Sequence, residues 1–138
     1  MLKQPEIVWV DGPTGRLETI YIPAQDEVAV GVAVINHPNP TQGGTNTNKV
    51  IQTVAKSLSR QGYHCYLPNL RGVGNSDGVH DYGVGEIDDV VAVVAHAQAA
   101  HPDVGQLTVA GFSFGGFVSA NVAQRVDIDH LLLLAPAV

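Results

Sequence analysis

The chain has 138 residues, of which 45% are hydrophobic and 14% are charged. A chain of this size forms one domain of ordinary length, and this composition is that of a globular protein rather than a disordered one. Seven Lys and Arg against thirteen Asp and Glu give a formal net charge of −6. This sign argues against nucleic acid as a partner, because binding phosphates needs an excess of cations.

Cysteine usage and hydropathy predict the cellular compartment of the protein. The single cysteine, Cys65, cannot form an internal disulfide, so nothing asks for an oxidising compartment. The N-terminal segment is interrupted by Lys3, Pro5 and Glu6 and lacks the apolar stretch of a signal peptide. The longest apolar run, 131–138, is well short of the roughly 20 residues that span a bilayer. We therefore expect a soluble, cytoplasmic protein that does not act at a membrane.

Segments typical of strands and of helices alternate along most of the chain. Runs rich in apolar and β-branched residues predict strands at 7–10, 17–22, 28–36, 64–68, 107–112 and 130–135. Helical spacing of apolar residues predicts helices at 50–58, 86–101 and 114–125. The first two strands flank turn-forming residues and predict a hairpin, whereas the continuous run 28–36 is typical of a strand buried on both faces. The alternation predicts an α/β fold with a mostly parallel sheet and helices on both faces.

The end of the chain departs from this pattern. The last predicted strand, 130–135, is strongly hydrophobic, and no helix follows it. A buried parallel strand at that position leaves its face and its edge uncovered. We therefore expect residues 1–138 to be the N-terminal portion of a single domain, truncated after the sixth strand, whose C-terminal strands and helices are missing.

The sharpest motif is Gly111-Phe112-Ser113-Phe114-Gly115, which stands where a predicted strand ends and a predicted helix begins. A nucleophilic serine on a tight strand-to-helix turn needs glycines two residues before and after it, because neighbouring backbone passes there without room for a Cβ atom. The motif predicts Ser113 as a nucleophile on such a turn, with Gly111 and Gly115 as its glycines. The alternative is a glycine-rich turn whose serine only caps the helix.

A serine nucleophile needs an oxyanion hole, which two backbone N–H groups usually supply. One comes from the residue after the serine, here Phe114, and the other from the loop after the third strand. In the loop His37-Pro38-Asn39-Pro40 the prolines carry no N–H, so only His37 and Asn39 can donate, and we favour Asn39. The alternative is a rigid turn fixed by its prolines, with no catalytic role.

Two glycine-rich stretches are candidates for nucleotide-binding loops, but neither matches the required motif. A Walker A loop needs glycine before its lysine and Ser or Thr after it, whereas Asn48 and Val50 flank Lys49. In the stretch 72–78 the third glycine comes one place too late for a dinucleotide fingerprint. The histidines and acids show no spacing typical of a metal site. We therefore predict neither a cofactor nor a metal.

Four stretches of the chain together resemble the α/β-hydrolase superfamily: HPNP at 37–40, GGTNTNK at 43–49, NLRGVGNSDG at 69–78 and GFSFGG at 111–116. More narrowly, they are similar to a group of small, lidless bacterial predicted hydrolases with an HPxP loop, a GG-x4-K stretch and an RGxGxS loop. The resemblance covers essentially the whole chain. It implies the α/β-hydrolase fold, a Ser113 nucleophile with an oxyanion hole at Asn39 and Phe114, and a loop from Arg71 to Gly78 beside the site.

The triad of this superfamily runs serine, acid, histidine along the chain, and after Ser113 only Asp127, Asp129 and His130 are available. These residues precede the last predicted strand at its N-terminal end, whereas the site lies at the carboxyl ends of the strands, so we do not expect them to serve. His37 is the histidine nearest the predicted site, but its position matches the oxyanion loop. We interpret the other histidines as surface or loop residues and expect the triad acid and histidine outside these residues.

Two functions are compatible with this pattern. The first is a serine hydrolase in which Ser113 attacks a small-molecule ester, thioester or amide and forms an acyl-enzyme, with the oxyanion on Asn39 and Phe114. The second is a non-catalytic binding or interaction domain that keeps the fold and lacks the acid and the histidine.

Overall fold

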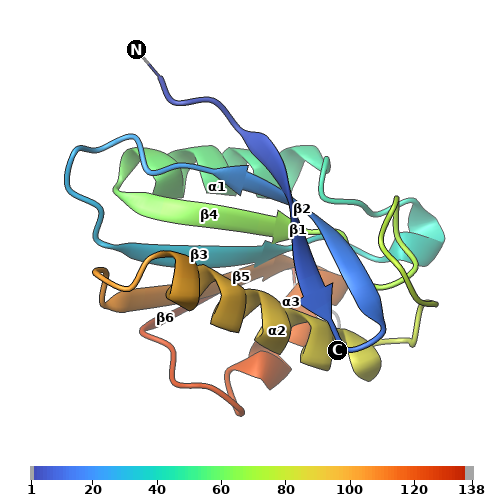
Figure 1. Ribbon diagram of the computed structural model, residues 1–138. Coiled ribbons are helices and arrows are strands. Elements are labelled where there is room, and N and C mark those ends of the chain that lie inside the picture. The colour runs from blue at the N-terminus through green and yellow to red at the C-terminus, as the bar shows by residue number, and fades with distance from the viewer. Residues whose placement is uncertain (1, 136–138) are drawn as a thin grey trace.

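Residues 2–135, which the computed structural model describes, form a single six-stranded sheet with helices on both faces (Figure 1). The strands are β1 (Glu6–Gly12), β2 (Gly15–Ile22), β3 (Gly31–Asn36), β4 (Tyr63–Pro68), β5 (Gln106–Phe112) and β6 (His130–Leu134). The helices are the 3-10 helix η1 (Pro40–Gln42) and the α-helices α1 (Lys49–Arg60), α2 (Gly85–Ala100) and α3 (Phe114–Val122). Among the described residues, no helix is long and apolar enough to cross a membrane.

The strands lie in the order β1-β2-β4-β3-β5-β6. β3 pairs in parallel with β4 and β5, and β5 pairs in parallel with β6, whereas β1-β2 and β2-β4 are antiparallel. The predicted hairpin is confirmed: Gly12 pairs with Gly15, which leaves a two-residue connection. The predicted α/β class and mostly parallel sheet are confirmed as well.

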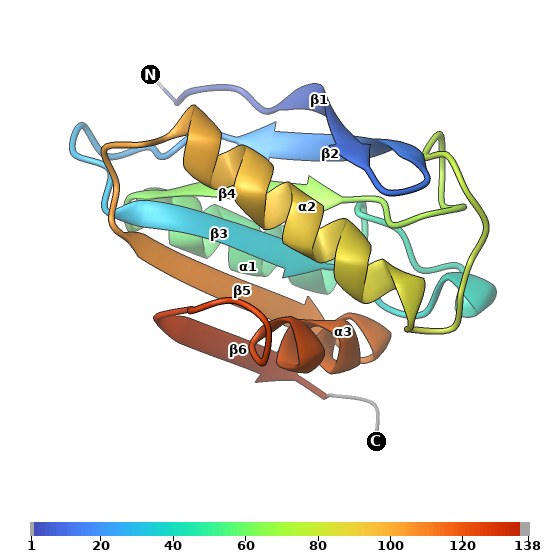
Figure 2. The same cartoon turned by 60° about the horizontal axis from the view of Figure 1, so that its bottom comes forward.

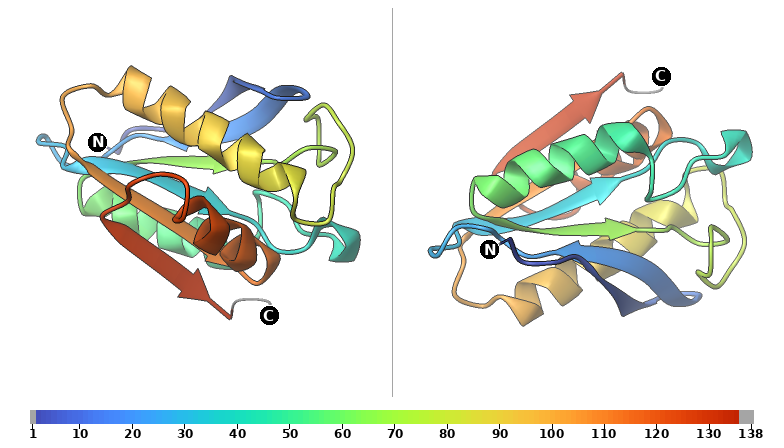
Figure 3. Two further views of the ribbon diagram at one scale, coloured as in Figure 1. Left: turned by 90° about the horizontal axis from the view of Figure 1, so that it is seen from below. Right: turned by 90° about the horizontal axis from the view of Figure 1, so that it is seen from above.

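Helices cover the two faces unequally. α1 packs on one face, where Ile51 and Ala55 contact a cluster with Ala33 and Ile35 of β3. α2 and α3 share the other face, where their valines pack against alternate residues of the same strand. Figure 2 and the two views of Figure 3 show α1 on one side of the sheet and α2 with α3 on the other. Every residue of β3 is buried, which explains its continuous apolar sequence.

The structure corrects two predicted boundaries. The strand predicted at 28–36 begins only at Gly31, because the chain first passes the amino end of β4, where the Val30 N–H donates to the Gly62 carbonyl at 2.8 Å. Val28 is accordingly 73% exposed. The helix predicted at 114–125 ends at Val122, since the chain tightens into a turn in which the Arg125 N–H donates to the Val122 carbonyl.

Candidate active site

Ser113 occupies the turn between β5 and α3 in a backbone conformation that side chains rarely adopt, with φ 56° and ψ −115°. Its N–H donates to the carbonyl of Leu134 in β6 at 2.9 Å, and its carbonyl accepts from the N–H of Gly116 at 2.9 Å. The hydroxyl makes no capping hydrogen bond to α3. The alternative in which Ser113 serves as a helix cap is therefore not what the structure shows.

The two glycines of the predicted turn are required by close backbone contacts. A Cβ atom on Gly111 would lie 2.1 Å from the carbonyl oxygen of Gly115. A Cβ atom on Gly115 would lie 2.2 Å from the carbonyl oxygen of Asn36 and 2.6 Å from that of His37. The turn therefore sits directly against the end of β3, which brings the loop after β3 to the serine.

Asn39 and Ser113 line the same cavity of about 220 Å³, which the loop between β3 and α1 forms together with the end of β5. The Asn39 side chain caps η1 by accepting from the N–H and hydroxyl of Thr41 at 2.9 and 2.8 Å. Within residues 2–135, no hydrogen bond uses the N–H of Asn39 or of Phe114. Both groups predicted to bind an oxyanion therefore remain available as donors.

His37 is a fixed structural residue rather than a base. It is fully buried, its Nε2 accepts the N–H of Leu70 at 3.1 Å, and its Nδ1 lies 2.8 Å from the carbonyl of Pro38. Both ring nitrogens are thus engaged in the neutral form, and burial lowers the pKa of this imidazole. The side chain ties the end of β3 to the loop after β4.

A polar pair that sequence analysis missed lies beneath the turn. Asn36 Nδ2 donates to Ser119 Oγ at 2.8 Å, and Ser119 Oγ lies 2.6 Å from the carbonyl oxygen of Gly115. Both side chains are fully buried. A serine inside a helix rich in apolar and small residues was the sequence signal for this pair. The pair links β3 to α3 just below Ser113.

The acids and the histidine that follow Ser113 are at the opposite end of the sheet, as the sequence predicts. Asp129 Oδ2 accepts the N–H of Leu107, at the start of β5, at 2.7 Å. With about 3.3 Å per strand residue, this position is roughly 20 Å from Ser113. His64 lies in β4, within the strand predicted at 64–68; it is half-buried and stacks on His101 with ring centroids 3.8 Å apart.

The loop after β4 is held by its own polar residues. The buried guanidinium of Arg71 binds both oxygens of Asp89 in α2, at 2.8 to 3.2 Å; these hydrogen bonds raise the pKa of Arg71. Ser76 Oγ accepts the N–H of Glu18 and donates to the carbonyl of Asn69. The predicted RGxGxS loop therefore anchors α2 and the hairpin to the sheet, and its polar side chains are used for structure.

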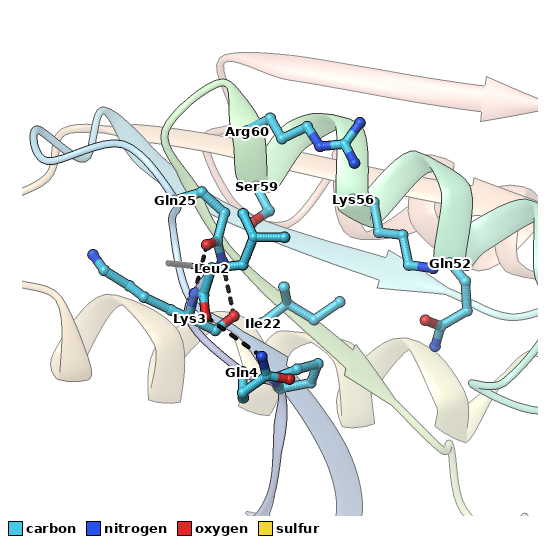
Figure 4. A pocket seen from close by; sticks show the side chains of 10 residues that line it. Leu2, Lys3, Gln4, Ile22, Gln25, Gln52, Lys56, Ser59 and Arg60 are labelled. Carbon is cyan, nitrogen blue, oxygen red and sulfur yellow. Dashed lines mark hydrogen bonds between the residues drawn. The ribbon is translucent and has the colours of Figure 1, made fainter.

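A second cavity, of about 280 Å³, lies between the N-terminal segment and α1. Figure 4 shows Lys56 and Arg60 of α1 beside it, with Leu2 and Ile22 opposite. No predicted site residue lines it. The candidate site is therefore the cavity at Ser113, where the ends of β3 and β5 meet and where parallel sheets place their sites.

The strand order, the strained serine and its two glycines can now be compared with known proteins. A family model described as alpha/beta hydrolase fold matches residues 34–136. The chain belongs to the alpha/beta hydrolase fold family. Two solved structures that resemble it closely come from Xanthomonas campestris, described as an α/β serine hydrolase without a lid, and from Coxiella burnetii, described as an α/β serine hydrolase homologue.

The likeness to these family members extends over nearly the whole chain. The Xanthomonas structure is 36% identical with a TM-score of 0.90, and the Coxiella structure is 37% identical with a TM-score of 0.90. Each comparison covers 99% of this chain, but only 63% and 64% of those chains. An uncharacterized protein of Rickettsia prowazekii is 36% identical over 95% of this chain and 55% of its own length. The chain thus spans between 55% and 64% of the length of these relatives.

Proposed function

We propose that the protein is a serine hydrolase in which Ser113 forms an acyl-enzyme with an ester, thioester or amide. The observation that carries this proposal is the backbone of Ser113, held at φ 56° between two glycines at which a Cβ atom would lie 2.1 and 2.2 Å from a backbone oxygen. Strain of this kind persists where surrounding structure enforces it and function uses it. The likeness to α/β serine hydrolases at 36% and 37% identity supports the proposal.

In the proposed reaction, Ser113 Oγ attacks the carbonyl carbon of the substrate while a base takes the hydroxyl proton. The carbonyl oxygen becomes an oxyanion that accepts from the N–H groups of Asn39 and Phe114. Collapse of this intermediate expels the alcohol, thiol or amine, which receives the proton, and leaves the acyl group on Ser113. Water then adds to the acyl carbon, the bond to Ser113 Oγ breaks, and the proton from water returns to Oγ as the acid leaves.

The described residues do not supply the base or its acid partner, and we propose where these two groups lie. Within residues 2–135, no histidine is hydrogen-bonded to Ser113: His37 is occupied by backbone groups, and Asp129 is bound at the far end of β5. We place the triad acid and histidine in the part of the fold that the longer relatives contain and this chain does not span. Cytoplasmic location and a small acyl substrate complete the proposal.

Labelling with a fluorophosphonate tests this function directly. The protein, expressed from its complete reading frame, is treated with the probe, and the adduct is located by mass spectrometry. We expect the adduct on Ser113, its loss in Ser113→Ala, and its retention in Ser57→Ala, a control at a serine of α1. A folded protein that gives no adduct on Ser113 would refute the proposal and favour the non-catalytic binding domain.

A further inference from the structure

A row of aromatic rings extends outward from the residue that follows Ser113. The ring of His80 lies 5.5 Å from that of Phe114, and the ring of Tyr82 lies 4.6 Å from that of His80, centroid to centroid. Phe117 of α3 lies against Gly83, where a Cβ atom would be 2.9 Å from its ring. We call Phe114, His80, Tyr82 and Phe117 the ring wall.

The two outer rings of the ring wall, those of Tyr82 and Phe117, are open to solvent within the part of the chain that the structure describes, whereas Phe114 and His80 are half-buried. Tyr82 is 80% exposed and Phe117 is 40% exposed, and the same loop carries Val79 and Val84 at 80% and 70%. Figure 2 shows this loop, which leads into α2, at the same end of the sheet as the start of α3 and the loop after β3. Apolar side chains gathered at one place on the surface are typical of a ligand-binding region.

The loop that carries His80 and Tyr82 of the ring wall is fixed by hydrogen bonds to Glu86. Glu86 in the first turn of α2 is fully buried, and its carboxylate accepts the N–H groups of Asp81 at 2.7 Å and Gly83 at 3.0 Å. The same carboxylate lies 3.1 Å from Nδ1 of His80. Asp81 in turn accepts the N–H of Gly85 at 2.8 Å. A carboxylate bound in this way fixes the loop before any ligand arrives.

Tyr82 itself is strained without being buried. Its φ is 53°, a conformation that is unfavourable for a bulky side chain. A residue that is 80% exposed gains little from packing, so the described fold offers no burial that offsets this strain. Strain of this kind is characteristic of residues that contact ligands.

We propose that the ring wall binds the apolar group of the substrate that flanks the bond cleaved at Ser113. This inference rests on the proposed function and names the substrate class: esters with an alkyl chain or an aromatic ring in preference to acetyl esters of small alcohols. The wall begins at Phe114, the residue that follows Ser113 in the chain and whose N–H is a proposed oxyanion donor, and its rings lead outward from there. The carboxylate of Glu86 is fully buried beneath the loop, so the side chain of Tyr82, and not that of Glu86, faces solvent at this place.

Two ester series test the proposal in the protein expressed from its complete reading frame. The first series varies the acyl group and compares p-nitrophenyl octanoate with p-nitrophenyl acetate. The second varies the leaving alcohol and compares octyl acetate with ethyl acetate. Tyr82→Gly removes the ring and suits the positive φ, and Phe117→Ala removes the neighbouring ring. Trp9→Ala is the control, because Trp9 has the same 40% exposure as Phe117 and lies on β1, which three strands separate from β5.

We expect the long-to-short ratio of kcat/KM to fall about tenfold in at least one series for Tyr82→Gly and Phe117→Ala, because several methylene groups lose their contacts. The Trp9→Ala ratios stay at the wild-type values in both series. Ratios that are equal in all variants, with Ser113 still labelled by the fluorophosphonate, overturn this inference alone. Absence of both hydrolysis and labelling overturns the proposed function and the inference together.

Discussion

The nucleophile turn depends on a glycine whose hydrogen atom faces the backbone of another strand, and this makes the cost of Gly115→Ala predictable. The added Cβ would lie 2.2 Å from the Asn36 carbonyl oxygen and 2.6 Å from that of His37, both inside any normal contact. These are main-chain atoms at the end of the central strand, so they cannot move aside as a side chain tip would. Overpacking of this kind costs about 3 kcal/mol, and the better helix propensity of alanine returns about 1 kcal/mol. We expect a net loss of about 2 kcal/mol.

Two other glycines separate this steric effect from backbone conformation. Gly43 has φ 85°, and a Cβ atom there would meet no other atom within 4 Å, so Gly43→Ala should cost only the left-handed conformation, about 1 kcal/mol. Gly105 has the same open space and is not among the residues with positive φ, so Gly105→Ala should gain about 0.5 kcal/mol. Urea unfolding with a common m-value ranks the three variants. If Gly115→Ala proves no more destabilising than Gly43→Ala, the contact with β3 is not what requires the glycine.

Two further predictions concern titratable groups that are fully or partly buried. Burial lowers the pKa values of His37 and His101 and lowers that of His64 from 6.5 to about 4. Below pH 6.5 the unfolded chain therefore binds more protons than the folded one. The free energy of unfolding should be highest above about pH 6.5 and should fall as the pH drops from there toward 4. Urea midpoints at pH 7.5 and 5 check this, and an equal slope in His64→Gln would contradict the role of that residue. Arg71→Met should cost about 3 to 5 kcal/mol by leaving the buried carboxylate of Asp89 unpaired. The double variant Arg71→Met/Asp89→Leu should recover much of this loss in the same unfolding assay, and strict additivity would refute the pairing.

Local sequence patterns were sufficient to predict the strands and helices, because the residues of each element show its periodicity by themselves. The apolar run of β3 and the helical spacing of α1 identify buried strand and amphipathic helix without reference to the rest of the chain. The same rule fails where an apolar run continues past the strand, as it does before Gly31, since pairing partners and not hydropathy decide where a strand begins. The glycine spacing around Ser113 predicted its turn for the same local reason.

The rest of the candidate site could not be predicted because it depends on contacts between distant residues. Glu86 is the first residue of the helix predicted at 86–101, yet its carboxylate binds the loop from His80 to Gly83. Nothing in the sequence marks Tyr82 as a residue with positive φ, because that conformation follows from how the loop is bound beneath it. His37 likewise shows its role only when Leu70 is placed beside it.

Ser113 offers a last test of whether its backbone is strained for function. A residue other than glycine at φ 56° and ψ −115° carries a backbone strain of about 1 to 3 kcal/mol. Replacing it with glycine relieves this strain. Part of the gain is offset because glycine has more conformational entropy in the unfolded chain. Ser113→Gly should therefore be about 1 kcal/mol more stable than Ser113→Ala, although both lose the hydroxyl and with it the fluorophosphonate adduct. Equal urea midpoints for the two variants would show that the turn is relaxed. A higher urea midpoint for Ser113→Gly would mean that a residue with a side chain lowers the stability of the fold at this position. Such a loss of stability is expected where a nucleophile must be held in place.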